Sequence, residues 1–213
     1  MLPLHRLHVR WDLPAVQRLG RLLLTSVNYL SIGCACLTVA VFALSALSKV
    51  RSRKAFGEFL AATRTLLATS VRASQVSGTA ARTAGMMVVA AEVAITVLVA
   101  LPSTARAGFG VAALLLLCFS VAIVATLRRG VRTECRCFGP SSAPLSRRHL
   151  VRNGVLLAVA LGGLITAEGR GERVHPAGVA IAVGAALVAA ALVVRFDDLA
   201  DLFVTPANER RES

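Results

Sequence analysis

The chain has 213 residues, of which 56% are hydrophobic and 16% are charged, and its formal net charge is +13. This composition excludes an ordinary soluble domain, which carries more charge and less apolar surface. The basic residues lie in loops between apolar segments, with one Trp and one Tyr in the whole chain, and this pattern excludes nucleic acid as the partner.

Five long apolar segments predict five membrane spans, because a bilayer span needs about 20 mainly apolar residues. The segments are apolar on all sides, whereas a helical bundle in water would show polar faces. The sequence predicts an all-α fold: a polytopic membrane helix bundle with four core spans plus a fifth C-terminal span. We divide it into a basic N-terminal extension (1–26), a four-span membrane domain (27–167), an additional transmembrane helix (168–195) and a polar tail (196–213).

Residues 1–21 contain four arginines, which is typical either of a short amphipathic helix on the head groups or of a loose tail. The first span, near residues 27–48, is too long for a cleaved signal, so we expect it to remain as an anchor. Ser45 and Lys49 at its end are four residues apart and share one side of the helix. The simpler interpretation of Lys49 is a lysine that extends to the head groups.

The connection between the first two spans contains apolar residues at helical spacing, which predicts an amphipathic helix at the interface: Phe56, Phe59, Leu60, Leu66, Leu67 and Val71. The second span (84–101) contains Glu92 near its middle and stops at Pro102. A carboxylate at that depth costs several kcal/mol unless it is neutral, paired or hydrated. We expect Lys49 or Arg152 as its partner, or a neutral Glu92 hydrogen-bonded inside the bundle.

The short link after Pro102 predicts that the second span forms an antiparallel hairpin with the third (107–127). Three cysteines lie inside spans and are interpreted as packing residues: Cys34, Cys36 and Cys118. The other two cysteines, Cys135 and Cys137, lie in the basic loop before the fourth span.

Cys135 and Cys137 are separated by one residue, so in an extended chain their Cα atoms would be about 7 Å apart, at the limit for a disulfide. A tight turn at Gly139-Pro140 would bring them together, and such a small disulfide ring is of the labile kind. Arg136 favours the reactive thiolate. A zinc site would need two further ligands, of which only His149 is near, and a structural disulfide or an idle thiol pair also stays open.

This turn, with the residues around it, resembles the MauE family of methylamine utilisation membrane proteins, which is similar to the wider DoxX-like group. The resemblance covers about residues 30–167. It rests on Arg129-Gly130, Cys135-Arg136-Cys137-Phe138-Gly139, Arg152-Asn153, the intramembrane Glu92, and Ser45-Ala46-Leu47-Ser48-Lys49, where Ala46 replaces a family glycine.

The resemblance implies a bundle of four core helices and a role in methylamine metabolism, in which the family helps to produce the disulfide-rich methylamine dehydrogenase alongside the thioredoxin-like protein MauD. The implied partners are the lipid bilayer, a thioredoxin-like protein of the MauD type and a disulfide-containing client, and no cofactor is expected. The implied site comprises Cys135 and Cys137 as catalytic residues, with Ser45, Lys49, Glu92, Phe138, Gly139, Arg152 and Asn153 in support.

Three functions compete. The first is a thiol–disulfide redox component that matures an extracytoplasmic client, the second a small-molecule or quinone carrier that uses a Glu92–Lys49 pair, and the third a docking scaffold. We expect a multi-pass protein of the cell membrane with the Cys135–Cys137 loop outside, where disulfides persist. The distribution of arginines favours the opposite orientation, because basic loops stay in the cytoplasm.

Overall fold

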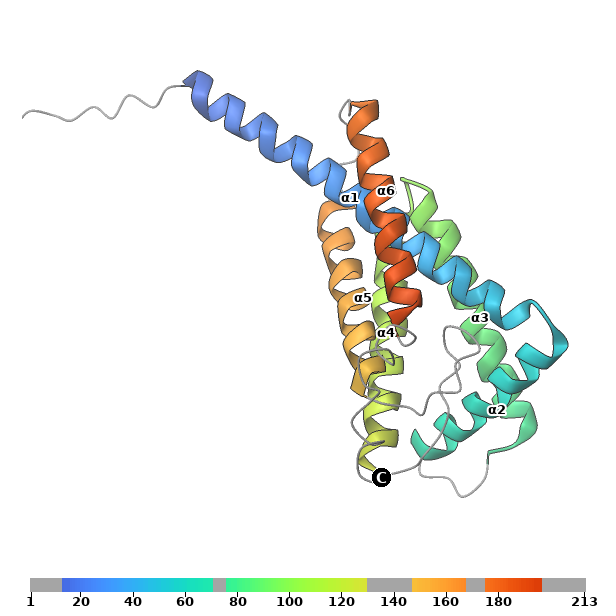
Figure 1. Cartoon of the computed structure of the whole chain (residues 1–213). Coiled ribbons are helices and arrows are strands. Elements are labelled where there is room, and N and C mark those ends of the chain that lie inside the picture. The colour runs from blue at the N-terminus through green and yellow to red at the C-terminus, as the bar shows by residue number, and fades with distance from the viewer. Residues whose placement is uncertain (1–12, 71–75, 130–146, 168–174, 197–213) are drawn as a thin grey trace, which may run out of the picture.

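A computed structural model describes residues 13–70, 76–129, 147–167 and 175–196 of the chain (Figure 1). Within these ranges all the regular structure is helical: α1 (Leu13–Val50), α2 (Arg53–Ser70), α3 (Gly78–Ala100), α4 (Ala105–Arg128), α5 (Arg147–Thr166) and α6 (Pro176–Val194). In the described part of the chain, five helices are long and apolar enough to cross a membrane, namely all except α2. The predicted polytopic membrane helix bundle is confirmed.

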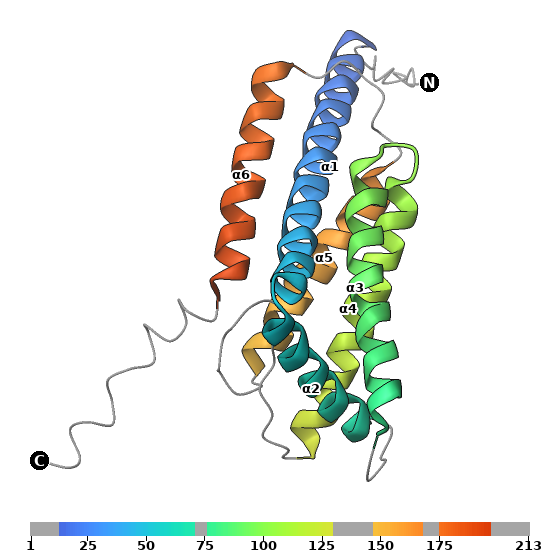
Figure 2. The same ribbon diagram turned by 90° about the vertical axis from the view of Figure 1, so that its right-hand side faces the viewer.

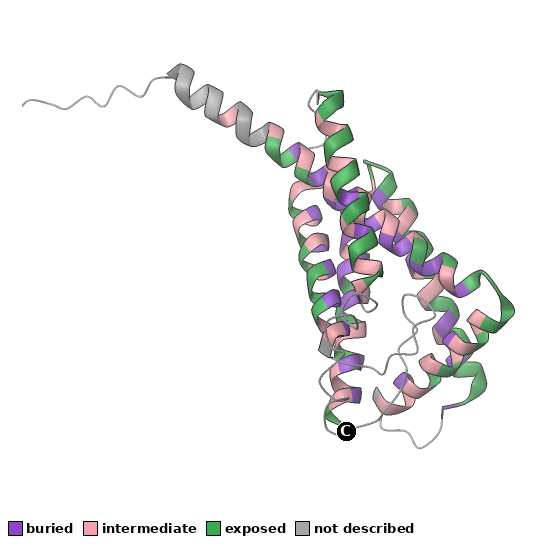
Figure 3. Ribbon diagram, viewed as in Figure 1, coloured by how far each residue is buried: buried purple, intermediate pink, exposed green. Residues whose placement is uncertain are grey.

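The helix α1 is the centre of the bundle, since α2, α3, α5 and α6 all pack against it. Figure 2 shows it running between α6 on one side and the α3–α4–α5 group on the other. Its inward face is buried at Val41 and Phe42, whereas Leu44 and Leu47 are exposed on the outward face (Figure 3). An exposed apolar face of this kind suits contact with lipid.

The first helix is longer than the predicted span, because it begins at Leu13 and continues without a break to Val50. Pro14 lies in its first turn, where a missing backbone N–H costs nothing. Residues 13–26 of the expected N-terminal extension therefore belong to this continuous helix, within which the candidate membrane span is Thr25–Val50. Residues 1–12 lie outside the described ranges.

The helix α2 confirms that the apolar spacing in this connection marks a helix, and its place at the membrane interface stays a prediction. It crosses one end of the bundle and packs against α1, α3 and α4 (Figure 2). Arg64 ties it to the following segment by donating from Nε to the Val76 carbonyl at 2.8 Å. Ser77 then caps α3, because its hydroxyl accepts a hydrogen bond from the Ala80 N–H.

The helices α3 and α4 form the predicted hairpin, joined by the turn after Ala100. A Cβ atom on Gly108 would lie only 2.7 Å from Val99 Cγ2, so a glycine lets the two helices approach this closely. The Thr104 hydroxyl donates to the Leu98 carbonyl at 2.9 Å and satisfies a free carbonyl at the end of α3.

Because successive helices run in alternating directions, several of them begin or finish at the same end of the bundle. We call this the α2 end: α1 ends there, α2 lies across it, α3 begins there, α4 ends there and α5 begins there (Figures 1 and 2). The α3–α4 turn and the start of α6 lie at the opposite end. There, the His175 N–H donates to Tyr29 Oη at 3.1 Å and fixes α6 to α1.

Candidate functional site

A buried pair of opposite charges joins α1 to α3 near the α2 end. Lys49 Nζ lies 2.6 Å from Glu92 Oε1, and the exposed fractions of the two side chains are 1% and 2%. Of the two partners expected for Glu92, the structure therefore gives Lys49 rather than Arg152. The interpretation of Lys49 as a lysine that extends to the head groups is wrong, because its ammonium group points into the bundle.

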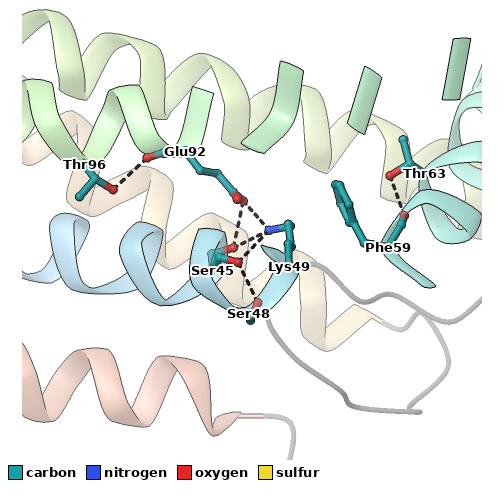
Figure 4. A network of polar contacts seen from close by, with 7 residues as sticks. All are labelled: Ser45, Ser48, Lys49, Phe59, Thr63, Glu92 and Thr96. Atoms are coloured by element: carbon teal, nitrogen blue, oxygen red, sulfur yellow. Dashed lines mark hydrogen bonds and ion pairs between the residues drawn. The ribbon is translucent and has the colours of Figure 1, made fainter. Parts of the chain in front are cut away.

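Ser45 completes the pair to a triangle of polar contacts (Figure 4). Its hydroxyl donates to Glu92 Oε1 at 2.9 Å and accepts from Lys49 Nζ at 2.7 Å. The spacing of four residues puts Ser45 one turn before Lys49 on the same side of α1, as predicted. The ammonium also donates to the Ser45 carbonyl at 3.5 Å, so residues of both α1 and α3 hold the positive charge.

The two carboxylate oxygens of Glu92 differ in their hydrogen bonds. Whereas Oε1 accepts from Ser45 and Lys49, Oε2 is buried and has no hydrogen-bond partner among the described residues. Buried acceptors in folded proteins are normally satisfied by protein or by ordered water. The triangle therefore presents one unused acceptor inside the bundle, a property expected of a site that binds water or a donor group.

An aromatic side chain from α2 covers the charge pair. The Phe59 ring centroid lies 5.3 Å from Lys49 Nζ, within the range of a cation–π contact, and Phe59 itself is buried. Phe56 lies next to it, with ring centroids 6.3 Å apart. The helix α2 thus closes the site at the α2 end. This role of Phe59 was not predicted.

A glycine on α3 allows this cover to sit close to the site. A Cβ atom on Gly85 would lie 2.5 Å from Leu60 Cδ2 and 3.3 Å from Phe59 Cε1. Gly85 precedes Glu92 by two helical turns, on the same side of α3. The close approach of α2 to α3 therefore depends on the absence of a side chain at this position.

We expect Gly85→Ala to lower the free energy of unfolding by about 1 kcal/mol, the low end of the usual cost of overpacking, because the end of the Leu60 side chain and the Phe59 ring must shift to make room. Thermal or denaturant unfolding of the purified protein measures this. Gly110→Ala in α4 is the matched control, since an added Cβ there meets nothing within 4 Å. Equal stabilities of the two variants would contradict the packing role of Gly85.

The start of α5 adds buried polar residues at the same end of the bundle. Arg152 and Asn153 are buried in the second turn of α5, with exposed fractions of 5% and 3%. His149 is buried one turn earlier, and Thr126 is buried near the end of the neighbouring helix α4. The predicted site residues Arg152 and Asn153 thus lie on the inward side of α5, although no contact with Glu92 is formed.

Three of the five cysteines lie in the described part of the chain, and two lie outside it. Cys135, Cys137, Phe138 and Gly139 lie outside the described residues, between α4 and α5. The helices that flank this segment, α4 up to Arg128 and α5 from Arg147, meet the α2 end. The chain therefore leaves and re-enters the bundle at the end that holds the charge pair.

The three described cysteines form no disulfide. Cys34 is buried in α1, as expected of a packing residue, and Cys36 is partly buried. Cys118 is exposed on α4, so its interpretation as a packing residue is wrong. The reason is helical phase: Cys118 follows the buried Leu116 by two positions and so points to another side of the helix.

Together, the five spanning helices and the buried lysine–glutamate pair define a polytopic helical membrane protein with an intramembrane polar site. The family model described as methylamine utilisation protein MauE matches residues 27–166. The chain therefore belongs to the MauE family, a family of methylamine utilisation membrane proteins, as its C-x-C turn suggested. Neither a curated protein nor a solved structure matches the chain.

Proposed function

We propose that this MauE-family protein takes part in methylamine metabolism as a membrane thiol–disulfide component that matures a disulfide-containing extracytoplasmic client. The observation that carries the proposal is the C-x-C pair, Cys135 and Cys137, in a family matched over residues 27–166. The partner is a thioredoxin-like protein of the MauD type, as the resemblance to the family implies.

The chemistry is an exchange in two steps. The thiolate of one cysteine attacks a sulfur of the partner's disulfide, so a mixed disulfide forms and one partner thiolate leaves. The second cysteine then attacks the mixed disulfide, which closes the Cys135–Cys137 disulfide and releases the second partner thiol. Two electrons pass to the partner, and the reverse sequence passes two electrons from it. Arg136 and nearby arginines favour the attacking thiolate.

The buried pair has a supporting role in this proposal. The α2 end is held together by Lys49 and Glu92, which bind α1 to α3, and by Phe59, which docks α2 over them. This is also the end at which the loop between α4 and α5 begins and finishes. A rigid end of this kind fixes the two attachment points of the C-x-C turn, as redox sites on loops require.

The redox state and accessibility of Cys135 and Cys137 in intact membranes test the proposal. Differential alkylation with a membrane-impermeant reagent, followed by peptide mass spectrometry, should label both cysteines only after reduction, because we place an oxidised pair outside. The buried Cys34 should stay unlabelled in native membranes and serves as the internal control. Free thiols reached only by a permeant reagent would contradict the proposed compartment.

A second function, that of a carrier for a small molecule or quinone, is favoured by one specific observation. Glu92 Oε2 is a buried acceptor without a partner among the described residues, beside a buried lysine. Charged pairs inside a membrane often mark a substrate or proton pathway. In a carrier, Glu92→Gln would abolish function while Cys135→Ser would leave it intact, the opposite of the order expected for thiol exchange.

A further inference from the structure

An apolar cavity opens between α2, α3 and α4 on the outside of the bundle. Its volume is about 180 Å³, and it is lined mainly by Leu66, Leu67, Val88, Leu115, Cys118 and Phe119. The one hydroxyl that borders it, on Thr63, donates to the Phe59 carbonyl at 2.9 Å. The cavity therefore offers apolar contacts and no unsatisfied hydroxyl, which suits a hydrocarbon segment.

The position of the cavity fits a membrane-facing site. Cys118 is exposed, and so are its neighbours Leu117 and Val121 on the outward side of α4. Along α4 the lining runs from Ala122, nearer the α2 end, to Leu115. This is a rise of about 10 Å towards the middle of the bilayer. A lipid chain that entered beside α2 would follow this direction.

Two basic side chains lie at the α2 end, on helices that line the cavity. Arg64 follows the lining residue Thr63 on α2. Arg129 follows Ala122 by seven residues, about two helical turns, so it shares the same side of α4. Both arginines are exposed. Each cationic side chain near the bilayer surface attracts anionic head groups.

From these two features we infer that the cavity is a binding site for an anionic phospholipid, with a segment of one acyl chain in the cavity and the phosphate between Arg64 and Arg129. The volume is sufficient for part of a chain, since a cavity of about 150 Å³ holds a benzene molecule. The arginines decide between occupants, because a neutral isoprenoid lipid would fill the same cavity without using them. This inference does not depend on the proposed thiol chemistry.

Native mass spectrometry of the full-length protein in a non-ionic detergent tests the inference, with dioleoyl phosphatidylglycerol and dioleoyl phosphatidylcholine added as probes. We expect one phosphatidylglycerol to be retained in preference to phosphatidylcholine. Each positive charge near a head group contributes a factor of about five. The combined variant Arg64→Gln, Arg129→Gln should therefore reduce the preference by roughly 25-fold, whereas Arg106→Gln at the opposite end should leave it unchanged.

Three further variants separate binding from folding. Ala122→Trp fills the cavity and should abolish retention of phosphatidylglycerol, whereas Val121→Trp, on a neighbouring residue that is 68% exposed and does not line the cavity, should not. Arg64→Lys keeps the charge but loses the Nε–H that reaches Val76, so it should retain the lipid. A purely structural role of Arg64 would make Arg64→Lys behave like Arg64→Gln.

Three outcomes would overturn the inference. One is equal retention of the two phospholipids by the unmodified protein. Another is unchanged phosphatidylglycerol binding in Ala122→Trp. The third is a co-purified neutral isoprenoid lipid that is still bound after replacement of the two arginines but is lost in Ala122→Trp, which would assign the cavity to that lipid class. Normal thiol exchange in a variant that no longer binds lipid would leave the proposed function standing.

Discussion

A Lys49→Met variant is expected to lose about 3–5 kcal/mol of unfolding free energy, because it leaves the Glu92 carboxylate buried without its positive partner. Ser45 would remain as a hydrogen-bond donor at 2.9 Å, and a single hydroxyl does not replace a full charge. Glu92→Met should cost a similar amount, since it strands the ammonium. Denaturant titration of the purified protein in detergent measures both losses.

The combined variant Lys49→Met, Glu92→Met should recover most of this loss, because two apolar side chains of similar length replace a pair that is expensive to desolvate. Lys54→Met is the control, since Lys54 is exposed on α2. If the combined variant folds but no longer supports client maturation, the pair has a role beyond stability. Single variants as stable as the unmodified protein would show that the bundle does not depend on the pair.

Replacing either cysteine of the C-x-C pair by serine should reduce client maturation to the background level. Attack and resolution need two different sulfur atoms, so one remaining thiol cannot complete the exchange. The readout is the fraction of client with its disulfides formed, measured by alkylation and mass spectrometry. Cys36→Ser is the matched control, because Cys36 lies within α1 and not in the loop that contains the C-x-C pair.

The two single variants should also differ from each other. Loss of the resolving cysteine leaves a mixed disulfide that cannot be released, so a covalent complex with the thioredoxin-like partner should accumulate on non-reducing gels. Loss of the attacking cysteine prevents that complex from forming. The comparison therefore identifies which of Cys135 and Cys137 attacks. Normal maturation in both variants would end the thiol-exchange proposal.

The number of spans and the need of Glu92 for a partner were predictable from the sequence, because both follow from the cost of polar groups in a bilayer. Helical spacing also predicted that Ser45 and Lys49 share a side of α1. The choice between Lys49 and Arg152 was not predictable, since spacing gives the face of each helix and not its neighbours. Only the packing of α1 against α3 resolves it.

The cover over the charge pair and the lipid-facing cavity were not predictable for a related reason. Phe59 was visible as one apolar residue of an interfacial helix, but its contact with Lys49 depends on how α2 docks. The close contact at Gly85 could not be predicted from the sequence, because a glycine in an apolar helix has many explanations. Cys118 was assigned to packing from its apolar surroundings, which in a membrane are the same inside and outside the bundle.

The separation of the two charges along the chain has a consequence for biogenesis. Lys49 and Glu92 are 43 residues apart, so α1 is synthesised and reaches the bilayer before its counter-charge exists. Lys49 lies in the last turn of α1. Its long side chain can therefore extend to the head groups until α3 is inserted. The counter-charge arrives with α3, before α4, α5 and α6 are made, so the Lys49–Glu92 contact can join α1 to α3 early in assembly of the bundle.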